Sequence, residues 1–283
     1  MLTSVHRDCG PQIDWRGIAA APPPPPPAPV TTRTRQAEQD RDNYRPGLLA
    51  RMFGGATKRR ASLAAEVEPA REQDQRETKA AHQQHLGQCE EVAAARDLAR
   101  FVLDGDVSAY AVALEELDVF EELREVGVEI GVNVPSSDVV CLQLLAHERQ
   151  VVPDEQETLT ARGKLSSKKM PKTRGNEIYQ DYICGAALRA CRETFAALPA
   201  QWVVVTVRTD LLDPGTGHIQ PTCVLTIVTP RQTLEGLRFE TLDPSEAMAN
   251  FLCRMKFKKG SGMASVEEFT EKDVPRGAAV ARP

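Results

Sequence analysis

Apolar residues are distributed unevenly along this chain of 283 residues. They are sparse before about Leu86 and dense after it, so the second half must supply most of the hydrophobic core. From Pro69 to about Asp106 the chain consists of good helix formers, and apolar side chains return every three or four residues. This pattern predicts a long helix that is solvated at its start and packed at its end. Alternatively, the helix pairs with another helix as in a coiled coil, although sustained heptads are absent.

The helical pattern continues through "DVSAYAVALEELDVFEELREVG", which predicts one or two further helices. Acidic residues alternate there with apolar residues at helical spacing. A hard metal cation needs oxygen ligands that converge from a loop, so we interpret this acidic run as a solvated helix face. The acids are Glu115, Glu116, Asp118, Glu121 and Glu122.

After Gly127 the apolar period changes from 3.6 to 2, which predicts β-strands. "VEIGVNV" and "VVCLQLLAH" are joined by the turn residues "PSSD", and "QWVVVTVRT" and "TCVLTIVT" by a longer loop, so each pair predicts a hairpin. An amphipathic helix that starts near Asn176 follows the first hairpin. A second helix, "DPSEAMANFLCRM", follows the other, with Asp243 as its N-cap. The expected fold class is α+β, with a polar helical N-terminal half and a C-terminal β-β-α-β-β-α sheet domain that has its helices on one face.

Four regions follow from these patterns. Residues 1–55 are expected to form a disordered or extended Pro-rich arm, because the consecutive prolines of "APPPPPPAP" fix φ and remove backbone donors. The arm is either a linker or a ligand for an aromatic-lined groove, and its "IDWRGI" stretch is expected to dock on the folded body or on a partner. Residues 56–126 are the helical region, 127–270 the α+β domain and 271–283 a flexible tail.

The chain is acidic overall, with a net charge of -5, but its cations gather in two segments of the second half. Six cations and no acid lie between Arg162 and Arg174, where Gly163, Pro171 and Gly175 oppose regular structure. The second segment, "CRMKFKKGSG", is expected to close the last helix, where cations also favour the negative end of the helix dipole.

These two segments are candidates for an anion-binding surface. The first lies at the start of the helix near Asn176, where free backbone N–H groups attract phosphate. If both segments share one side of the sheet, they form a footprint for a nucleic-acid backbone that reads no base sequence. The other interpretations are a solvated loop and cations that pair with the acidic N-terminal half. The candidate ligands of the anion are Lys164, Lys168, Lys169, Lys172, Arg174, Lys256, Lys258 and Lys259.

The leading hypothesis is a non-enzymatic, cytosolic binding protein with this basic surface and a helical association region. One alternative is a metal-dependent nuclease or hydrolase that uses Asp138 with Glu129, or a metal site made of Asp210, Asp213 and His218. Another alternative is a structural adaptor that uses the polyproline arm. The sequence has no P-loop, nucleophile elbow or zinc-protease motif, so we assign no catalytic residue, metal or cofactor.

The seven cysteines are an odd number and include no C-x-x-C pair, so a disulfide framework is not expected. Cys184 and Cys191 share one face of the amphipathic helix and are expected to be core residues. No apolar run is long enough for a membrane span, and the first residues lack the apolar stretch of a secretory signal. We therefore expect a cytoplasmic protein without a membrane partner.

Three segments carry a resemblance to known proteins: "GKLSSKKMPK", "YQDYICGAALRACRETFAALP" and "LDPSEAMANFLCRMKFKK". Together they resemble bacterial proteins of uncharacterised function that have a variable, helical, polar front half. The resemblance covers the second half of the chain. It implies one folded C-terminal domain, and it implies no activity and no catalytic residue.

Overall fold

The structure is a computed structural model that describes residues 4–47, 55–146, 152–153, 155–159, 165–213 and 215–275. The chain divides into two units. Met1–Arg16 and Leu98–Pro283 form the first unit, and Gly17–Asp97 form the second.

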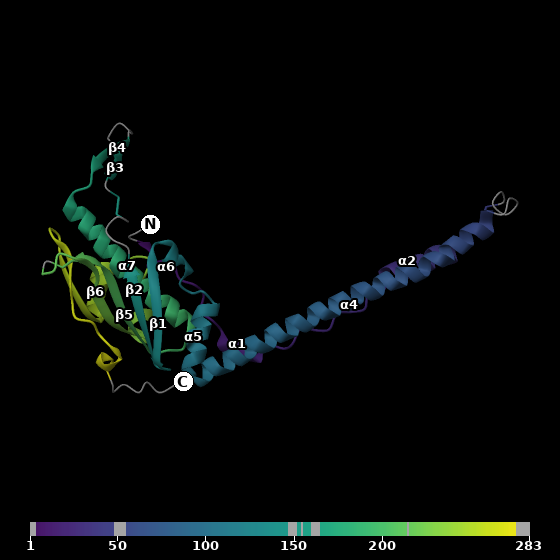
Figure 1. The fold of residues 1–283 in the computed structure, drawn as a ribbon, viewed down its shortest axis with the longest axis horizontal. Helices are drawn as coiled ribbons and strands as arrows, with labels where there is room; N and C mark the ends of the chain where they lie inside the picture. Colours follow the sequence, from purple (N-terminus) through teal and green to yellow (C-terminus); the bar gives the residue numbers. More distant parts are fainter. Residues whose placement is uncertain are drawn as a thin grey trace. The chain divides into compact units, whose positions relative to one another are not determined.

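A mixed six-stranded sheet is the centre of the first unit (Figure 1). Its strands lie in the order β1-β2-β5-β6-β7-β8, and all neighbours are antiparallel except β2 and β5. Strands β2 and β5 can pair in parallel because the long helix α7 lies between them in the sequence. This helix carries the chain back to the end of the sheet where β2 begins. The strands are β1 (Val128–Ser136), β2 (Val139–Ala146), β5 (Trp202–Leu212), β6 (Ile219–Pro230), β7 (Leu252–Lys258) and β8 (Gly262–Ala264).

The helices of this unit pack on one face of the sheet, as the sequence predicts. Alternate residues of the central strands are buried there, among them Leu142 of β2 and Val205 of β5. On the opposite face, Phe269 and Val274 of the C-terminal segment pack against Val204. The helices are α5 (Val107–Glu116), α6 (Glu121–Glu125), α7 (Lys172–Ala197), α8 (Arg231–Glu235) and α9 (Pro244–Ala247), with 3-10 turns η3 (Met248–Asn250) and η4 (Glu271–Asp273).

The last predicted helix is much shorter than expected. Asp243 does cap it, because its carboxylate accepts hydrogen bonds from the backbone amides of Ser245 and Glu246. The helix ends at Ala247, however, and after η3 the chain becomes strand β7, which pairs with β6. Apolar and basic residues alternate along β7 with period 2, so the pairing with β6 overrides the helical spacing of the same residues.

The first basic segment is also more regular than expected. Strand β4 (Leu165–Lys169) pairs in antiparallel orientation with β3 (Glu155–Leu159), and α7 starts three residues after β4, at Lys172. A two-stranded hairpin therefore carries part of the positive charge that the sequence places in an irregular loop.

The N-terminal residues of the first unit are packed and not extended into solvent. The indole N–H of Trp15, at the start of α1 (Trp15–Ala20), donates to the carbonyl oxygen of Ala197 at 2.5 Å. The amide of Ile13 donates to the carbonyl of Ala196 at 2.9 Å. The predicted docking of the "IDWRGI" stretch on the folded body is therefore observed for Ile13 and Trp15.

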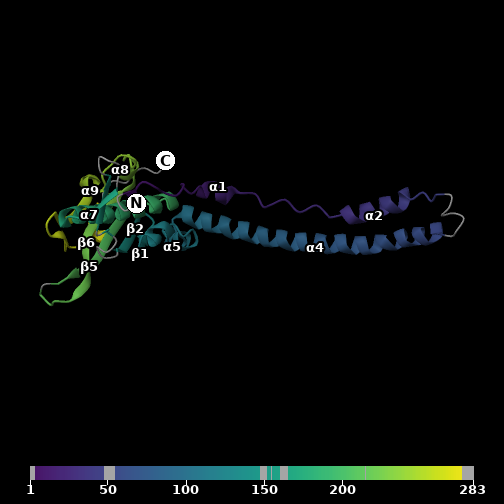
Figure 2. The same cartoon turned by 90° about the horizontal axis from the view of Figure 1, so that it is seen from above.

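The second unit contains α2 (Thr32–Asn43) and most of the 50-residue helix α4 (Gly55–Asp104), which lie side by side in both views (Figures 1 and 2). The carboxylate of Asp74 on α4 accepts hydrogen bonds from the amides of Arg33 and Thr34, at 3.2 and 2.7 Å, and so caps α2. Helix α4 starts before Pro69, which lies in its interior instead of its first turn. The buried residues Leu63, Val67 and Asp74 form a narrow stripe along one side of this helix, as expected for a helix that packs on that side only.

Candidate functional site

The first group of predicted anion ligands lies where hairpin β3–β4 leads into α7. Lys168 and Lys169 are the last residues of β4, Lys172 opens α7, and Arg174 lies in its first turn. All four are exposed. Lys164 lies outside the described residues.

The second group lies on β7 and the turn after it, not at the end of a helix as predicted. Lys256 and Lys258 are exposed residues of β7, and Lys259 follows them. The thioether of Met255 lies 3.7 Å from the thiol of Cys184 on α7, so Met255 faces the helix. Because side chains alternate along a strand, Lys256 and Lys258 point to the opposite face of the sheet. The sequence-based explanation by a helix dipole therefore fails for this group.

The two groups meet at the start of α7. Glu177 joins them: its carboxylate oxygens lie 2.7 Å from Lys259 Nζ and 3.4 Å from Arg174 Nη1. The amide of the buried Asn176 side chain donates to the carbonyl oxygen of Lys259 at 2.7 Å. Gly262 has φ of +87°, a conformation that residues with a side chain rarely adopt, and this favours glycine in the turn. The β7–β8 turn is therefore fixed against α7.

We name this surface the basic edge. It follows hairpin β3–β4, passes the start of α7 and continues along β7, the strand next to the short edge strand β8. Its described members are Lys168, Lys169, Lys172, Arg174, Lys256, Lys258 and Lys259.

Neutralisation of the basic edge is only partial. A hydrogen bond from Lys259 holds the pKa of the Glu177 carboxyl below its ordinary value, and the same contact raises the pKa of Lys259. By contrast, Lys168, Lys169, Lys256 and Lys258 form no ion pair with any residue that the structure describes. Four exposed ammonium groups thus remain available for an external anion.

Arg254, the first cation of the second basic segment, has a different role. Its guanidinium lies 4.1 Å from the centre of the Phe269 ring and donates to the carbonyl oxygens of Glu267 and Glu268. This arginine fixes the C-terminal segment on the helix-free face of the sheet, so we exclude it from the basic edge.

Helix α7 adds its own positive potential to the basic edge. Its N-cap is Pro171, whose side chain makes no hydrogen bond to the amides of the first turn. The positive end of the helix dipole favours an anion near Arg174.

An acidic groove of about 870 Å³ borders the basic edge, between α7, α9 and β7. Met248, Phe251 and Met255 contribute apolar surface to it. Burial and the neighbouring charge of Asp243 raise the pKa of the Asp181 carboxyl in this groove. The carboxylates beyond Glu177 therefore disfavour an anion in the groove, although the edge cations Arg174 and Lys259 also line it. The carboxylates that line the groove are Glu177, Asp181, Asp243 and Glu246.

The residues of the alternative metal sites do not come together. Glu129 pairs with Leu145 near one end of hairpin β1–β2, whereas Asp138 lies in the turn at the other end, roughly 20 Å away at the rise of a strand. The Asp213 carboxylate accepts hydrogen bonds from the Gly215 amide and the Thr216 hydroxyl, which stabilise its own turn. Within the described ranges, no three His, Cys, Asp or Glu side chains form a group that could hold a metal ion.

Comparison with known proteins supplies no relative: no protein family, curated protein or solved structure matches this chain. Among the helices that the structure describes, none combines the length and the apolar character needed to cross a lipid bilayer. Function must therefore be inferred from the geometry of the chain itself.

Sequence reasoning identified the cations but missed the residues that hold them together. Asn176 and Glu177 stand in a polar first turn of α7, and Gly262 lies in a glycine-rich stretch that resembles a flexible loop. The only local signal is the pair of glycines Gly260 and Gly262 after a run of lysines, which is typical of a tight turn. Their contact with α7 depends on the tertiary fold.

Proposed function

We propose that this protein is a non-enzymatic binding protein that holds a nucleic acid by its phosphate backbone along the basic edge. The observation that carries the proposal is the convergence of two basic segments, 83 residues apart at the Asn176–Lys259 contact, on one end of the first unit. A run of lysines in a solvated loop does not require such a contact.

The charge distribution supports a long, flexible polyanion over a small phosphate compound. The lysines lie on both faces of the sheet at β7 and do not surround one cavity, so a single phosphate group could reach only a few of them. A nucleic-acid strand carries regularly spaced phosphates and can follow a curved surface. The acidic groove beside Glu177 would repel the strand and keep it on the edge.

The chemistry of the edge predicts binding that does not depend on base sequence. Lysine ammonium groups contact phosphate oxygens, which carry no base information. Seven described cations form the edge, and Phe257, the aromatic residue between Lys256 and Lys258, lines the acidic groove instead. Binding should therefore be strongly weakened by salt, because it is driven by the release of counterions.

Fluorescence anisotropy with a labelled duplex of mixed sequence tests the proposal. The full chain should bind the duplex at about 50 mM salt and lose about tenfold or more of its affinity at about 200 mM. A second duplex of scrambled sequence should give the same affinity within about twofold. Absence of binding at the lower salt concentration would refute the proposed function.

Charge-reversal variants locate the surface. Lys168→Glu with Lys169→Glu, and separately Lys256→Glu with Lys258→Glu, should each weaken binding by at least about tenfold at low salt. The matched control is Arg238→Glu with Lys272→Glu, which changes the net charge equally at exposed positions of the same unit outside the edge. If the control weakens binding as much as the two test pairs, total charge and not the basic edge determines affinity.

A further inference from the structure

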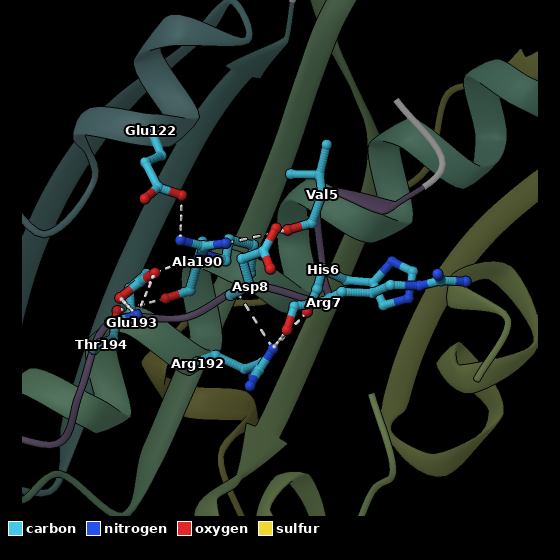
Figure 3. A network of polar contacts seen from close by, with 11 residues as sticks. Val5, His6, Arg7, Asp8, Glu122, Ala190, Arg192, Glu193 and Thr194 are labelled. Atoms are coloured by element: carbon cyan, nitrogen blue, oxygen red, sulfur yellow. Dashed lines mark hydrogen bonds and ion pairs between the residues drawn. The ribbon is translucent and has the colours of Figure 1, made fainter. Parts of the chain in front are cut away.

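The N-terminal strap, which we define as residues 4–16, is held on α7 mainly through its backbone. Arg192 Nη1 donates to the carbonyl oxygens of His6, Arg7 and Asp8, at 2.6, 2.7 and 3.3 Å (Figure 3). The amide of Gly10 donates to both carboxylate oxygens of Glu193, at 3.2 and 3.1 Å. The Arg192 contacts fix the turn at residues 4–7, in which the amide of Arg7 also donates to the carbonyl of Ser4 at 3.0 Å, and none of them requires a particular strap side chain.

A buried ion-pair network prepares α7 for these contacts. Arg189 lies between Glu193, at 2.5 Å on the same helix, and Glu122 of α6, at 2.6 Å. The side chains of Arg189 and Glu193 are only 6% and 7% exposed. Because Arg189 holds one oxygen of Glu193, the carboxylate is oriented to receive the Gly10 amide.

His6 is the exception among the strap residues, because its side chain is inserted into the protein. It is 1% exposed and its ring lies against Gly185 of α7. Neither ring nitrogen makes a hydrogen bond of good geometry in the described structure, although the backbone of Leu242 interacts with the ring and favours its protonated form. A buried polar group without a partner costs about 1–3 kcal/mol, so this position weakens strap docking even when the imidazole is neutral.

The charges around His6 make its protonated form still less favourable. Arg7 on the strap and Arg192 on α7 both act on the imidazole with positive charge, and Asp243, before α9, is the facing carboxylate that opposes them. An imidazolium in the docked strap would thus lie between two guanidinium groups and away from water. Once the strap has left α7, the same cation would be hydrated.

We propose that the N-terminal strap is an acid-sensitive clasp, which docks on α7 while His6 is neutral and leaves α7 when His6 takes up a proton. Release uncovers Arg189, Arg192 and Glu193, the side chains of α7 on which the strap docks. The clasp would thus couple acidification to the release of the N-terminal segment.

The pH range in which the strap is released follows from the direction in which docking shifts the pKa of His6. Burial, followed by the charges of Arg7 and Arg192, lowers the pKa of His6 from 6.5 in the docked strap. In the released strap the ordinary value applies. Between the two values only the released form binds a proton, so the docking constant falls by about tenfold per pH unit as pH decreases below 6.5. Docking is strongest above that range, where His6 is neutral in both states.

Trp15 provides a direct readout in the full chain, because it is 7% exposed when the strap is docked. Trp202→Phe leaves Trp15 as the single tryptophan. Acrylamide, a neutral quencher, should quench Trp15 fluorescence weakly at about pH 8 and several-fold more strongly at about pH 5. Far-UV circular dichroism over the same range shows whether the remaining fold stays intact.

His6→Leu in the same background separates the clasp from general acid effects. Leucine fills the buried position and cannot titrate, so quenching should stay weak from about pH 8 to about pH 5. His6→Gln, which keeps polar atoms and cannot titrate either, should give an equally flat profile. Arg192→Met removes the hydrogen bonds to the strap carbonyls, so it should increase quenching at every pH. Its quenching level is the reference value for a released strap.

Two results would overturn the clasp. One is a pH-independent quenching signal in the protein that retains His6. The other is the same pH dependence in the His6→Leu and His6→Gln variants as in the protein that retains His6, which would assign the transition to other groups.

Discussion

Glu177 lies between two cations from distant parts of the chain, with one carboxylate oxygen 2.7 Å from Lys259 Nζ and the other 3.4 Å from Arg174 Nη1. This carboxylate both connects and partly neutralises the basic edge. It also marks the border with the acidic groove, of which it is a lining residue. The position of the positive surface therefore depends on one residue in the first turns of α7.

Removal of this carboxylate should strengthen nucleic-acid binding. Glu177→Gln keeps the size of the side chain but frees Arg174 and Lys259 and removes a negative charge near the bound phosphates. We expect about threefold tighter binding at low salt, measured by anisotropy, and a smaller gain at high salt. Glu246, an exposed acid of the same groove, forms no ion pair with any described residue, so Glu246→Gln is the control and should change affinity less. Weaker binding by Glu177→Gln would mean that the position of the two cations matters more than their free charge.

The cap of α2 should make the second unit sensitive to acid. Although burial opposes it, hydrogen bonds from Thr34 and Arg33 keep the pKa of the Asp74 carboxyl below its ordinary value of 3.8. The stabilisation is thus complete above pH 3.8 and is lost as the pH falls through the lowered pKa.

Asp74→Ala should reproduce this loss at neutral pH. The α2 amides would lose their acceptors, and helical signal for up to the 12 residues of α2 should disappear from circular dichroism. Asp74→Asn, which retains an acceptor oxygen, should lose less. An unchanged spectrum for Asp74→Ala would show that α2 does not depend on this cap.

Replacing one residue of the buried ion pair on α7 should reduce stability more than replacing both. Arg189→Met leaves Glu193 buried without its cation, so we expect a loss of about 3–5 kcal/mol in the free energy of unfolding. Combining Arg189→Met with Glu193→Leu removes both charges and should recover part of that loss, measured by urea denaturation. A double variant less stable than Arg189→Met would indicate that the apolar replacements do not fit this site.

The seven cysteines should differ in their reaction with a thiol reagent at about pH 8. Burial raises the pKa of Cys191 to about 12, and burial also raises the pKa values of Cys9, Cys141, Cys223 and Cys253 to about 11. The pKa of Cys184, which is buried in the core, is also raised by burial.

Cys89 on α4 is half-buried, and its thiol lies 3.6 Å from Nε2 of His85. It should therefore react first, and Cys89→Ser should abolish the fast phase of modification. A fast phase that persists in Cys89→Ser would show that one of the other thiols is more accessible than its position indicates.

Local sequence patterns correctly predicted that β1 pairs with β2. Apolar and polar residues alternate from Val128 and again from Val140, and turn residues lie between the two runs, so an antiparallel hairpin is the simplest pairing. The Asp243 cap is likewise a local effect and was predicted. The segment after Phe251 was predicted wrongly, because its apolar residues fit helical spacing as well as alternation, and pairing with β6 decides between the two.

The candidate site shows the same limit. The cations could be recognised from the sequence because charge is a property of each residue. Their convergence could not, because the Asn176–Lys259 contact joins residues 83 apart and needs the completed sheet. His6 carries no local signal either, since only the packing of the strap on α7 buries it.

The most direct test of the account is the salt dependence of nucleic-acid affinity in the protein with all four unpaired lysines reversed, Lys168→Glu, Lys169→Glu, Lys256→Glu and Lys258→Glu. Each lost phosphate contact should reduce the slope of log affinity against log salt by about 0.9 on duplex DNA. If both segments contact the same strand, the reductions for the two pairs should add in the fourfold variant. A slope equal to that of the unsubstituted protein would contradict the basic edge as the binding surface.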